Sequence, residues 1–246
     1  MRREVAVRIA ESWNEIAHAP AGWTPGKISV VVSPGSRSAP PDWVGTIKLC
    51  AGSVAAGTLI TAPDKQQAAR VREQLGDVAP DRAAEPESWG ALMPGDPARV
   101  LGPTDLAYLD TPDFRPATGE GVQEVALADV TDAIAALEGA ASPDEVYEAG
   151  ITYATSPLFV VWRGETVAAA CGYARWVETL AHMLVLTHPA HRGQGLAKRT
   201  ATEASRHALD AGLIPQWRAR VEASQAVARS LGYVTPGAQL SLRLDA

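Results

Sequence analysis

Residues 179–209 constrain the fold more than any other stretch of this chain. They read TLAHMLVLT, then HPAHRGQGLA, then KRTATEASRHAL. The apolar run predicts a buried strand, and the alanine-rich segment predicts a helix whose small residues recur at helical spacing. Gly193 and Gly195 lie between them and predict a tight turn. A strand that leads through a glycine turn into a helix is therefore the expected central unit.

The start of that helix is predicted to bind an anion. Backbone N–H groups in a first helical turn have no partner within the helix and lie at the positive end of its dipole. Phosphate is the usual ligand of such a turn, and glycines let it approach the backbone. Lys198 and Arg199 fall in this first turn, where cations are unfavourable unless an anion lies nearby. The alternative is that both are solvated surface charges.

Composition narrows the classes of protein that fit. With 246 residues, 46% of them hydrophobic and 20% charged, the chain can bury a full core and global disorder is excluded. A net charge of −6 argues against a nucleic-acid-binding surface. Cys50 and Cys171 lie far apart without ligand spacing, so we expect no metal site and a reduced, cytoplasmic setting.

The termini and apolar runs give no sign of a membrane protein. Charges interrupt the first 20 residues, so these do not form a secretory signal. No apolar run approaches the ~20 residues that a membrane helix needs. We therefore expect neither a membrane nor a nucleic acid as a partner.

A stretch rich in proline, glycine and acid at 110–121 is the predicted domain boundary, which gives domains 1–118 and 119–246. In the first domain, helices are expected at 3–17 and 63–75, and strands at 28–32, 46–50 and 54–61. Residues 100–109 return to apolar character after a polar, proline-rich stretch.

The second domain is expected to run strand, two helices, three strands, helix, strand, helix and final strands. The predicted segments are 122–128, 130–137, 143–149, 158–162, 167–176, 180–187, 195–210, 214–221, 222–231, 233–234 and 239–244. Ser142 is the expected N-cap of the helix at 143–149, with Pro143 in its first position.

Two motifs in this order resemble the GCN5-related N-acetyltransferase (GNAT) family. The turn Arg192-Gly193-Gln194-Gly195-Leu196-Ala197 is similar to the family's R/Q-x-x-G-x-G/A acyl-CoA motif. The block at 212–233, which ends in Leu231-Gly232-Tyr233, resembles its later strand–helix motif. The resemblance covers about residues 120–246 and implies an α/β (α+β) fold, with a mixed, mostly antiparallel central sheet flanked by helices.

The first half is interpreted as a degenerate GNAT-like or accessory α/β domain packed on the second. Its own strand-to-helix turn at 61–64 lacks glycine and carries an acid, so it should not bind phosphate. A recognition module for a protein partner is the alternative.

The resemblance implies an N-acyltransferase that moves an acyl group from a CoA thioester to a primary amine of a small molecule by direct attack. Acetyl-CoA or another acyl-CoA would be the co-substrate, without a metal. Backbone pairing with the pantetheine arm is implied at the end of the strand, and phosphate binding at the turn. The implied donor-binding residues are Leu184, Val185, Leu186, Thr187, Arg192, Gly193, Gln194, Gly195, Leu196, Ala197 and Lys198.

Two alternatives use the same turn. In the first, an acyl carrier protein is the donor, and Lys198, Arg199 and Arg206 meet its acidic surface. In the second, the chain is a non-catalytic module that binds and senses acyl-CoA. A departure from the family favours this second alternative, because Ala228 stands where a tyrosine often serves as the acid.

Three residues are candidates for catalysis. His182 lies near where relatives place a glutamate, and its ordinary pKa suits proton abstraction. It shares a strand face with Leu184 and Leu186, so a core histidine is equally expected. Glu178 is the second candidate, with a solvated strand-end charge as the alternative. Ser224 matches a common family serine, although N-capping of its helix would explain it.

Overall fold

The computed structural model describes residues 1–19, 24, 26–49, 57–119 and 121–245. Its chain forms two compact units. The first comprises Met1–Ala107, Arg218–Glu222 and Thr235–Ala246, and the second comprises Tyr108–Trp217 and Ala223–Val234. Both units are therefore discontinuous in sequence, and the predicted domains 1–118 and 119–246 stay a prediction.

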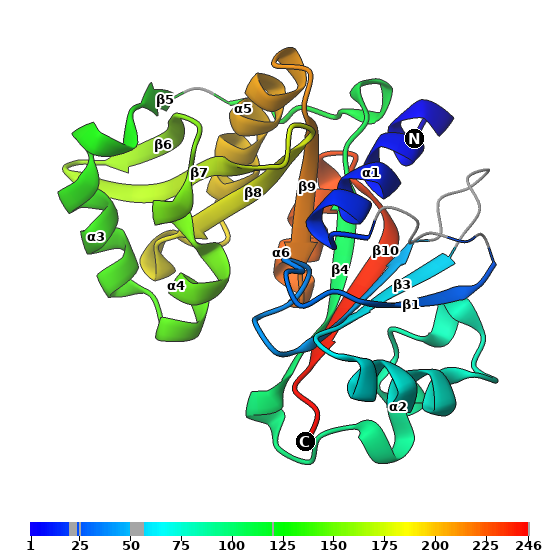
Figure 1. The fold of residues 1–246 in the computed structure, drawn as a ribbon. Coiled ribbons are helices and arrows are strands. Elements are labelled where there is room, and N and C mark those ends of the chain that lie inside the picture. Colours follow the sequence, from blue (N-terminus) through cyan, green and yellow to red (C-terminus); the bar gives the residue numbers. More distant parts are fainter. Residues whose placement is uncertain (20–23, 25, 50–56, 120, 246) are drawn as a thin grey trace. The chain divides into compact units, whose positions relative to one another are not determined.

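The N-terminal unit contains strands in the spatial order β1-β3-β2-β10-β4 (Figure 1). β1 (Ile28–Val32) runs parallel to β3 (Gly57–Ala62), which pairs antiparallel with β2 (Val44–Leu49). β10 (Val234–Leu242) pairs antiparallel with β2, and β4 (Val100–Tyr108) follows β10 in the order. The last strand of the chain thus lies among the strands of the N-terminal unit, between β2 and β4.

Helices α1 (Arg3–Ile16) and α2 (Lys65–Leu75) belong to this unit. Asp64 caps α2 by accepting a hydrogen bond from the backbone N–H of Gln67 at 2.7 Å. Apolar side chains on α2 and on one face of the sheet form a buried cluster around Trp89. Its members include Val44, Ile60, Ala68, Val71, Leu75, Leu240 and Leu242.

The C-terminal unit contains strands in the order β9-β8-β7-β6-β5. Its pairs β5–β6, β6–β7 and β7–β8 are antiparallel, whereas β8 and β9 run parallel. The sheet is therefore mixed and mostly antiparallel, which confirms the predicted fold class. The strands are β5 (Val122–Val125), β6 (Leu158–Arg163), β7 (Thr166–Trp176), β8 (Leu180–Thr187) and β9 (Ile214–Ala219).

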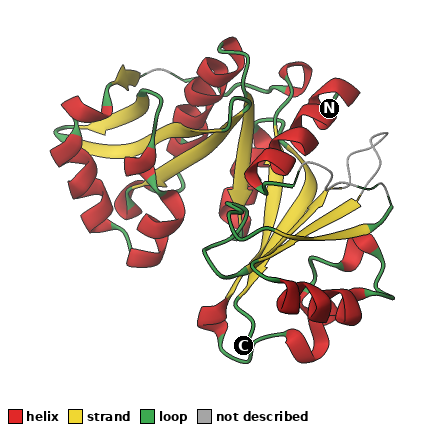
Figure 2. Cartoon of the chain, viewed as in Figure 1, coloured by secondary structure: helices red, strands yellow, loops and turns green. Residues whose placement is uncertain are grey.

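Helices cover both faces of this sheet (Figures 1 and 2). On one face, α3 (Thr131–Ala140) and α4 (Pro143–Ala149) contribute to a buried cluster that also holds side chains of β6, β7 and β8. On the other face lies α5 (Leu196–Asp210), whose buried residues are mostly small, so the helix lies close to the strands. The helix α6 (Glu222–Ser230) precedes β10.

Most predicted segments are present, with shifts at their ends. The strand expected at 122–128 ends at Val125, because a 3-10 turn follows at Leu127–Asp129. The two final extended segments form a single strand, since Gly237 keeps the pairing with Leu49. Residues 50 and 54–56, in two predicted strands, lie outside the described residues. Within the described part of the chain, no helix is long and apolar enough to span a bilayer.

The glycine of the Leu231-Gly232-Tyr233 ending has a steric explanation. Gly232 has a left-handed φ of +96°, and a Cβ built there would collide with the carbonyl group of Asp113. The neighbouring Leu231 carbonyl accepts a hydrogen bond from the Arg115 backbone N–H at 2.9 Å. Residues 113–115 therefore lie directly against this turn, and a side chain cannot fit between them.

We expect Gly232→Ala to be strongly destabilising. The left-handed conformation alone costs an alanine about 1–2 kcal/mol, and the collision with Asp113 adds to this. Gly164→Ala is the matched control, because Gly164 has a φ of +60° in a hairpin turn where a Cβ meets open space. Urea denaturation should show a much larger loss for Gly232→Ala, and equal losses would contradict the steric explanation.

Candidate functional site

The turn between β8 and α5 leaves open space at its backbone. Gly193 and Gly195 have left-handed φ values of +75° and +71°, and a Cβ at either would meet open space. Gly195 is the N-cap of α5, and within the described chain no side chain forms a capping hydrogen bond there. The first amides of α5 therefore face an exposed turn where an anion can bind.

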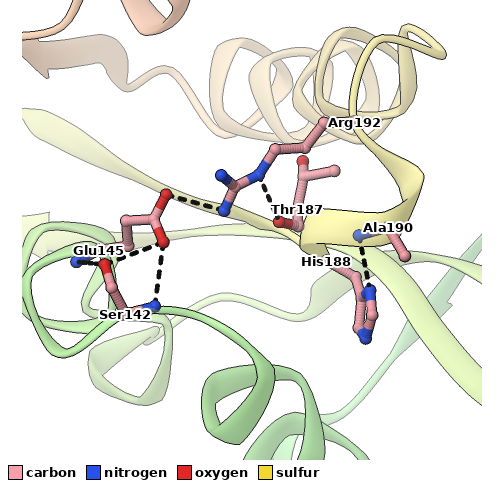
Figure 3. A network of polar contacts seen from close by, with 6 residues as sticks. All are labelled: Ser142, Glu145, Thr187, His188, Ala190 and Arg192. Carbon is pink, nitrogen blue, oxygen red and sulfur yellow. Dashed lines mark hydrogen bonds and ion pairs between the residues drawn. The ribbon is translucent and has the colours of Figure 1, made fainter.

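Arg192 is tied to the start of α4 by an ion pair (Figure 3). Its Nη2 lies 2.8 Å from Oε1 of Glu145, and its Nε donates to the Thr187 carbonyl at 3.5 Å. Glu145 also forms a capping box with Ser142, whose backbone N–H donates to Oε2 at 3.0 Å. The network orients the guanidinium beside the glycine turn.

The environment of Glu145 lowers the pKa of its carboxyl group. The largest cause is the hydrogen bond from the Ser142 backbone N–H, followed by that from the Ser142 hydroxyl, and Arg192 adds a favourable charge. Both members of the ion pair remain more than a third exposed, so their attraction is weakened by solvent. The sequence predicted Ser142 as the N-cap, but it gave no sign that the capping carboxylate also pairs with Arg192.

The other polar side chains near the turn differ in their contacts. His188 accepts a hydrogen bond at Nδ1 from the Ala190 backbone N–H at 3.2 Å, and its ring lies 5.2 Å from that of His191 (Figure 3). Arg199 lies against the backbone of Gly119, and Arg206 pairs with Glu203 on the same helix. Lys198 is half-buried in the first turn of α5.

β8, which leads to the glycine turn, and β9, which leads to α6, stop pairing with each other part-way along their length. β8 and β9 pair at three positions, the last being His182 with Gln216, although β8 continues to Thr187 and β9 to Ala219. Beyond His182, no other strand of the described residues pairs with this edge of β8. Such an edge can pair with an extended ligand.

The pairing of β8 with β7 shows to which side the backbone groups of each β8 residue point. The backbone N–H of His188 donates to the carbonyl of Ala168 in β7. Because these directions alternate along a strand, the backbone groups of Leu184 and Leu186 also point toward β7. Val185 and Thr187 then direct their backbone groups toward the open edge. Of the four strand residues predicted to bind the donor through the backbone, these two direct their backbone groups to the open edge, whereas Leu184 and Leu186 belong to the buried cluster. The part of all four in binding stays a prediction.

His182 is buried at the last paired position. Its Nδ1 lies 2.6 Å from Oε1 of Gln216, and its ring stacks on Trp176 with centroids 4.2 Å apart. A carbonyl oxygen only accepts, so Nδ1 is the donor and the lone pair of the neutral ring is on Nε2. The structure therefore gives this histidine a polar partner and a defined tautomer, which a purely apolar core position would not provide.

Glu178 lies away from this arrangement on the turn between β7 and β8. Its side chain is 87% exposed and pairs with Arg175 at 2.7 Å. This geometry matches the alternative of a solvated charge at the strand end.

Ser224 does not cap its helix, so that alternative is wrong. α6 begins at Glu222, which places Ser224 in the first turn, where its Oγ accepts a hydrogen bond from Nε1 of Trp217 at 2.9 Å. The Trp217 ring packs edge-on against Tyr233 at 5.5 Å. Ser224 thus fastens α6 to β9, and a direct part in catalysis stays a prediction.

Three further reactive side chains have structural roles. Cys171 is fully buried, and burial raises the pKa of its thiol. Burial likewise raises the pKa of Tyr173 and of Tyr233, whose hydroxyls bond to His207 at 3.0 Å and to Ser205 at 2.8 Å. No cluster of metal-binding side chains occurs among the residues described.

The sequence of the C-terminal unit is similar to a known family. A GNAT acetyltransferase family model matches residues 155–238. The match includes β6 to β9, the glycine turn and most of β10, and it confirms the GNAT resemblance of the C-terminal half. Among curated proteins, none matches this sequence.

Solved structures similar to this chain include GNAT proteins from several bacteria. A GNAT-family protein from Novosphingobium aromaticivorans is 23% identical over 60% of this chain and 66% of its own, with a TM-score of 0.47. A GCN5-related N-acetyltransferase from Kribbella flavida is 17% identical over 60% of each chain, with a TM-score of 0.47. A GCN5-related N-acetyltransferase-like protein from Streptococcus suis is 15% identical over 97% of this chain and 98% of its own, with a TM-score of 0.48. The match thus spans less than two thirds of the first two proteins.

The capping network gives a testable pH dependence. We expect Ser142→Ala to raise the pKa of Glu145 toward its ordinary value, because the hydroxyl bond is lost and the helix start loosens. Since the folded-state pKa is lowered, the stabilisation from Glu145 is present above its unfolded pKa and is lost as the pH falls through the folded value. NMR titration of the Glu145 carboxyl carbon measures the change.

Thr131→Ala is the control for this titration. Thr131 opens the neighbouring helix α3, and its hydroxyl bonds to the Leu127 carbonyl at 3.2 Å. This variant should leave the Glu145 titration as in the wild type. An unchanged titration in Ser142→Ala as well would contradict the assigned cause.

Proposed function

We propose that the C-terminal unit is an N-acyltransferase that transfers an acyl group from a CoA thioester to a primary amine of a small molecule. The observation that carries this proposal is the end of β8–β9 pairing at His182 and Gln216, on the same strand that ends in the glycine turn. From His182 to Thr187 the strand extends roughly 16 Å. An extended donor can therefore reach from the turn to the point where the strands separate.

Each part of an acyl-CoA has a matching group along this path. The amides of the glycine turn suit the diphosphate, with Arg192 and Lys198 as neighbouring cations. The open edge at Val185 and Thr187 suits the amides of the pantetheine arm. The match of residues 155–238 to GNAT acetyltransferases supports the same donor.

In the proposed reaction the amine attacks the thioester carbonyl carbon directly. The ammonium first loses a proton, for which Nε2 of His182 is the proposed acceptor. The C–N bond then forms, the C–S bond breaks, and CoA leaves as a thiolate that takes a proton from solvent or from the product. Because a thiolate is a stable leaving group, the alanine at position 228 does not prevent turnover.

An acyl carrier protein is a less well supported donor. Of the basic residues that could meet an acidic carrier, Arg206 pairs with Glu203 and Arg199 lies against Gly119. Lys198 is the remaining member of the predicted set. CoA, whose diphosphate needs backbone amides more than a broad basic surface, fits the turn better.

Gly195→Asp should abolish or strongly weaken CoA binding. The new carboxylate would enter the open space where the diphosphate is proposed to lie, and its charge would repel the ligand. We expect at least about a tenfold loss of affinity, which corresponds to 1.4 kcal/mol. Isothermal titration calorimetry with CoA measures it.

Gly164→Asp is the control, since it introduces the same residue at another open, left-handed turn position. This variant should bind CoA like the wild type. If Gly195→Asp also kept wild-type affinity, the diphosphate would have to bind elsewhere.

His182→Gln should lower kcat by about 10²-fold or more, the usual contribution of a general base, while the KM for acyl-CoA changes little. Thiol release from acetyl-CoA with a panel of primary amines measures both constants. His188→Gln is the control histidine and should retain kcat. If neither the wild type nor His188→Gln releases thiol although both bind CoA, the result would support the non-catalytic module instead.

A further inference from the structure

Gln216 has a buried hydrogen-bond donor that the folded chain leaves unused. Its side chain is 0% exposed, and Oε1 accepts the hydrogen bond from His182. Its Nε2 has no hydrogen-bond partner among the described residues. An unpaired buried amide donor is costly, so a partner is expected in the working state of the protein.

The position of Gln216 indicates what that partner is. It is the last residue of β9 that pairs with β8, and paired residues of neighbouring strands direct their side chains to the same face. Its amide thus lies beside His182 where the two strands separate. Trp217 is the next residue along β9, and its ring contacts Tyr233 and Ser224.

We propose that Nε2 of Gln216 donates a hydrogen bond to the carbonyl oxygen of the bound acyl thioester, an inference that rests on the proposed function. This oxygen gains negative charge when the amine attacks, and a fixed donor in a buried site stabilises that charge. Oε1 of the same amide holds His182 by Nδ1. One side chain therefore sets the position of the acyl carbonyl relative to the proposed base.

Comparison of acetyl-CoA with CoA isolates this contact, because free CoA has the diphosphate and the arm but no acyl carbonyl. Gln216→Met keeps the length of the side chain and removes its donor. We expect this variant to bind acetyl-CoA about two- to tenfold more weakly than the wild type, the usual effect of one hydrogen bond. Its affinity for CoA should be unchanged in the same calorimetric titration.

Gln239→Met is the matched control. Gln239 is also a buried glutamine on a strand, β10, and its Nε2 donates to the Ser38 carbonyl at 2.6 Å. Its substitution removes a comparable buried amide in the N-terminal unit. We expect this variant to bind both ligands like the wild type.

The outcomes separate this inference from the proposed function. Wild-type protein that binds neither ligand would overturn both. If the wild type binds both ligands tightly and Gln216→Met binds each of them with the wild-type affinity, only the role of Gln216 would be overturned. That result would indicate that water satisfies Nε2. If Gln216→Met does not fold, Gln216→Glu keeps the shape and should weaken acetyl-CoA binding more than CoA binding, because a carboxylate repels the carbonyl oxygen.

Discussion

The separation of β8 from β9 after His182 and Gln216 is the constraint on which the rest of the C-terminal unit depends. Up to that pair the parallel strands satisfy each other's backbone groups. Beyond it, Val185 and Thr187 face an edge with which no strand in the described part of the chain pairs. The separation needs support from both strands: β8 is held by its antiparallel pairing with β7 as far as Thr187, and β9 is fastened to α6 through Trp217 and Ser224.

The same strand connects two sites of different physical character. At one end, exposed backbone amides and a half-exposed Arg192 form a site suited to a highly charged, hydrated group. At the other end, His182 and Gln216 are buried, and their hydrogen bond is stronger because solvent is excluded. An acyl-CoA has the same division, with a charged diphosphate at one end and a small thioester at the other.

Local signals in the sequence predicted much of the fold. The strand Leu180–Thr187 and the helix Pro143–Ala149 have the predicted bounds, because each is delimited by its own pattern or by a cap. Contacts between distant segments were not predictable. Ser142 was predicted as an N-cap, but the ion pair between Glu145 and Arg192 was not. Ser224 suggested an N-cap, although it accepts a hydrogen bond from the indole of Trp217 on β9.

The sequence by itself determined the glycine turn, the helix that follows it and the family resemblance, because these depend on residues close together in the chain and on backbone conformations that few side chains allow. Only the tertiary structure decided which side chains meet where the strands separate. His182 and Gln216 are 34 residues apart, and their pairing depends on strand register, which is set by the packing of whole elements. For the same reason, only the structure distinguished Val185 and Thr187, which face the open edge, from their two buried neighbours.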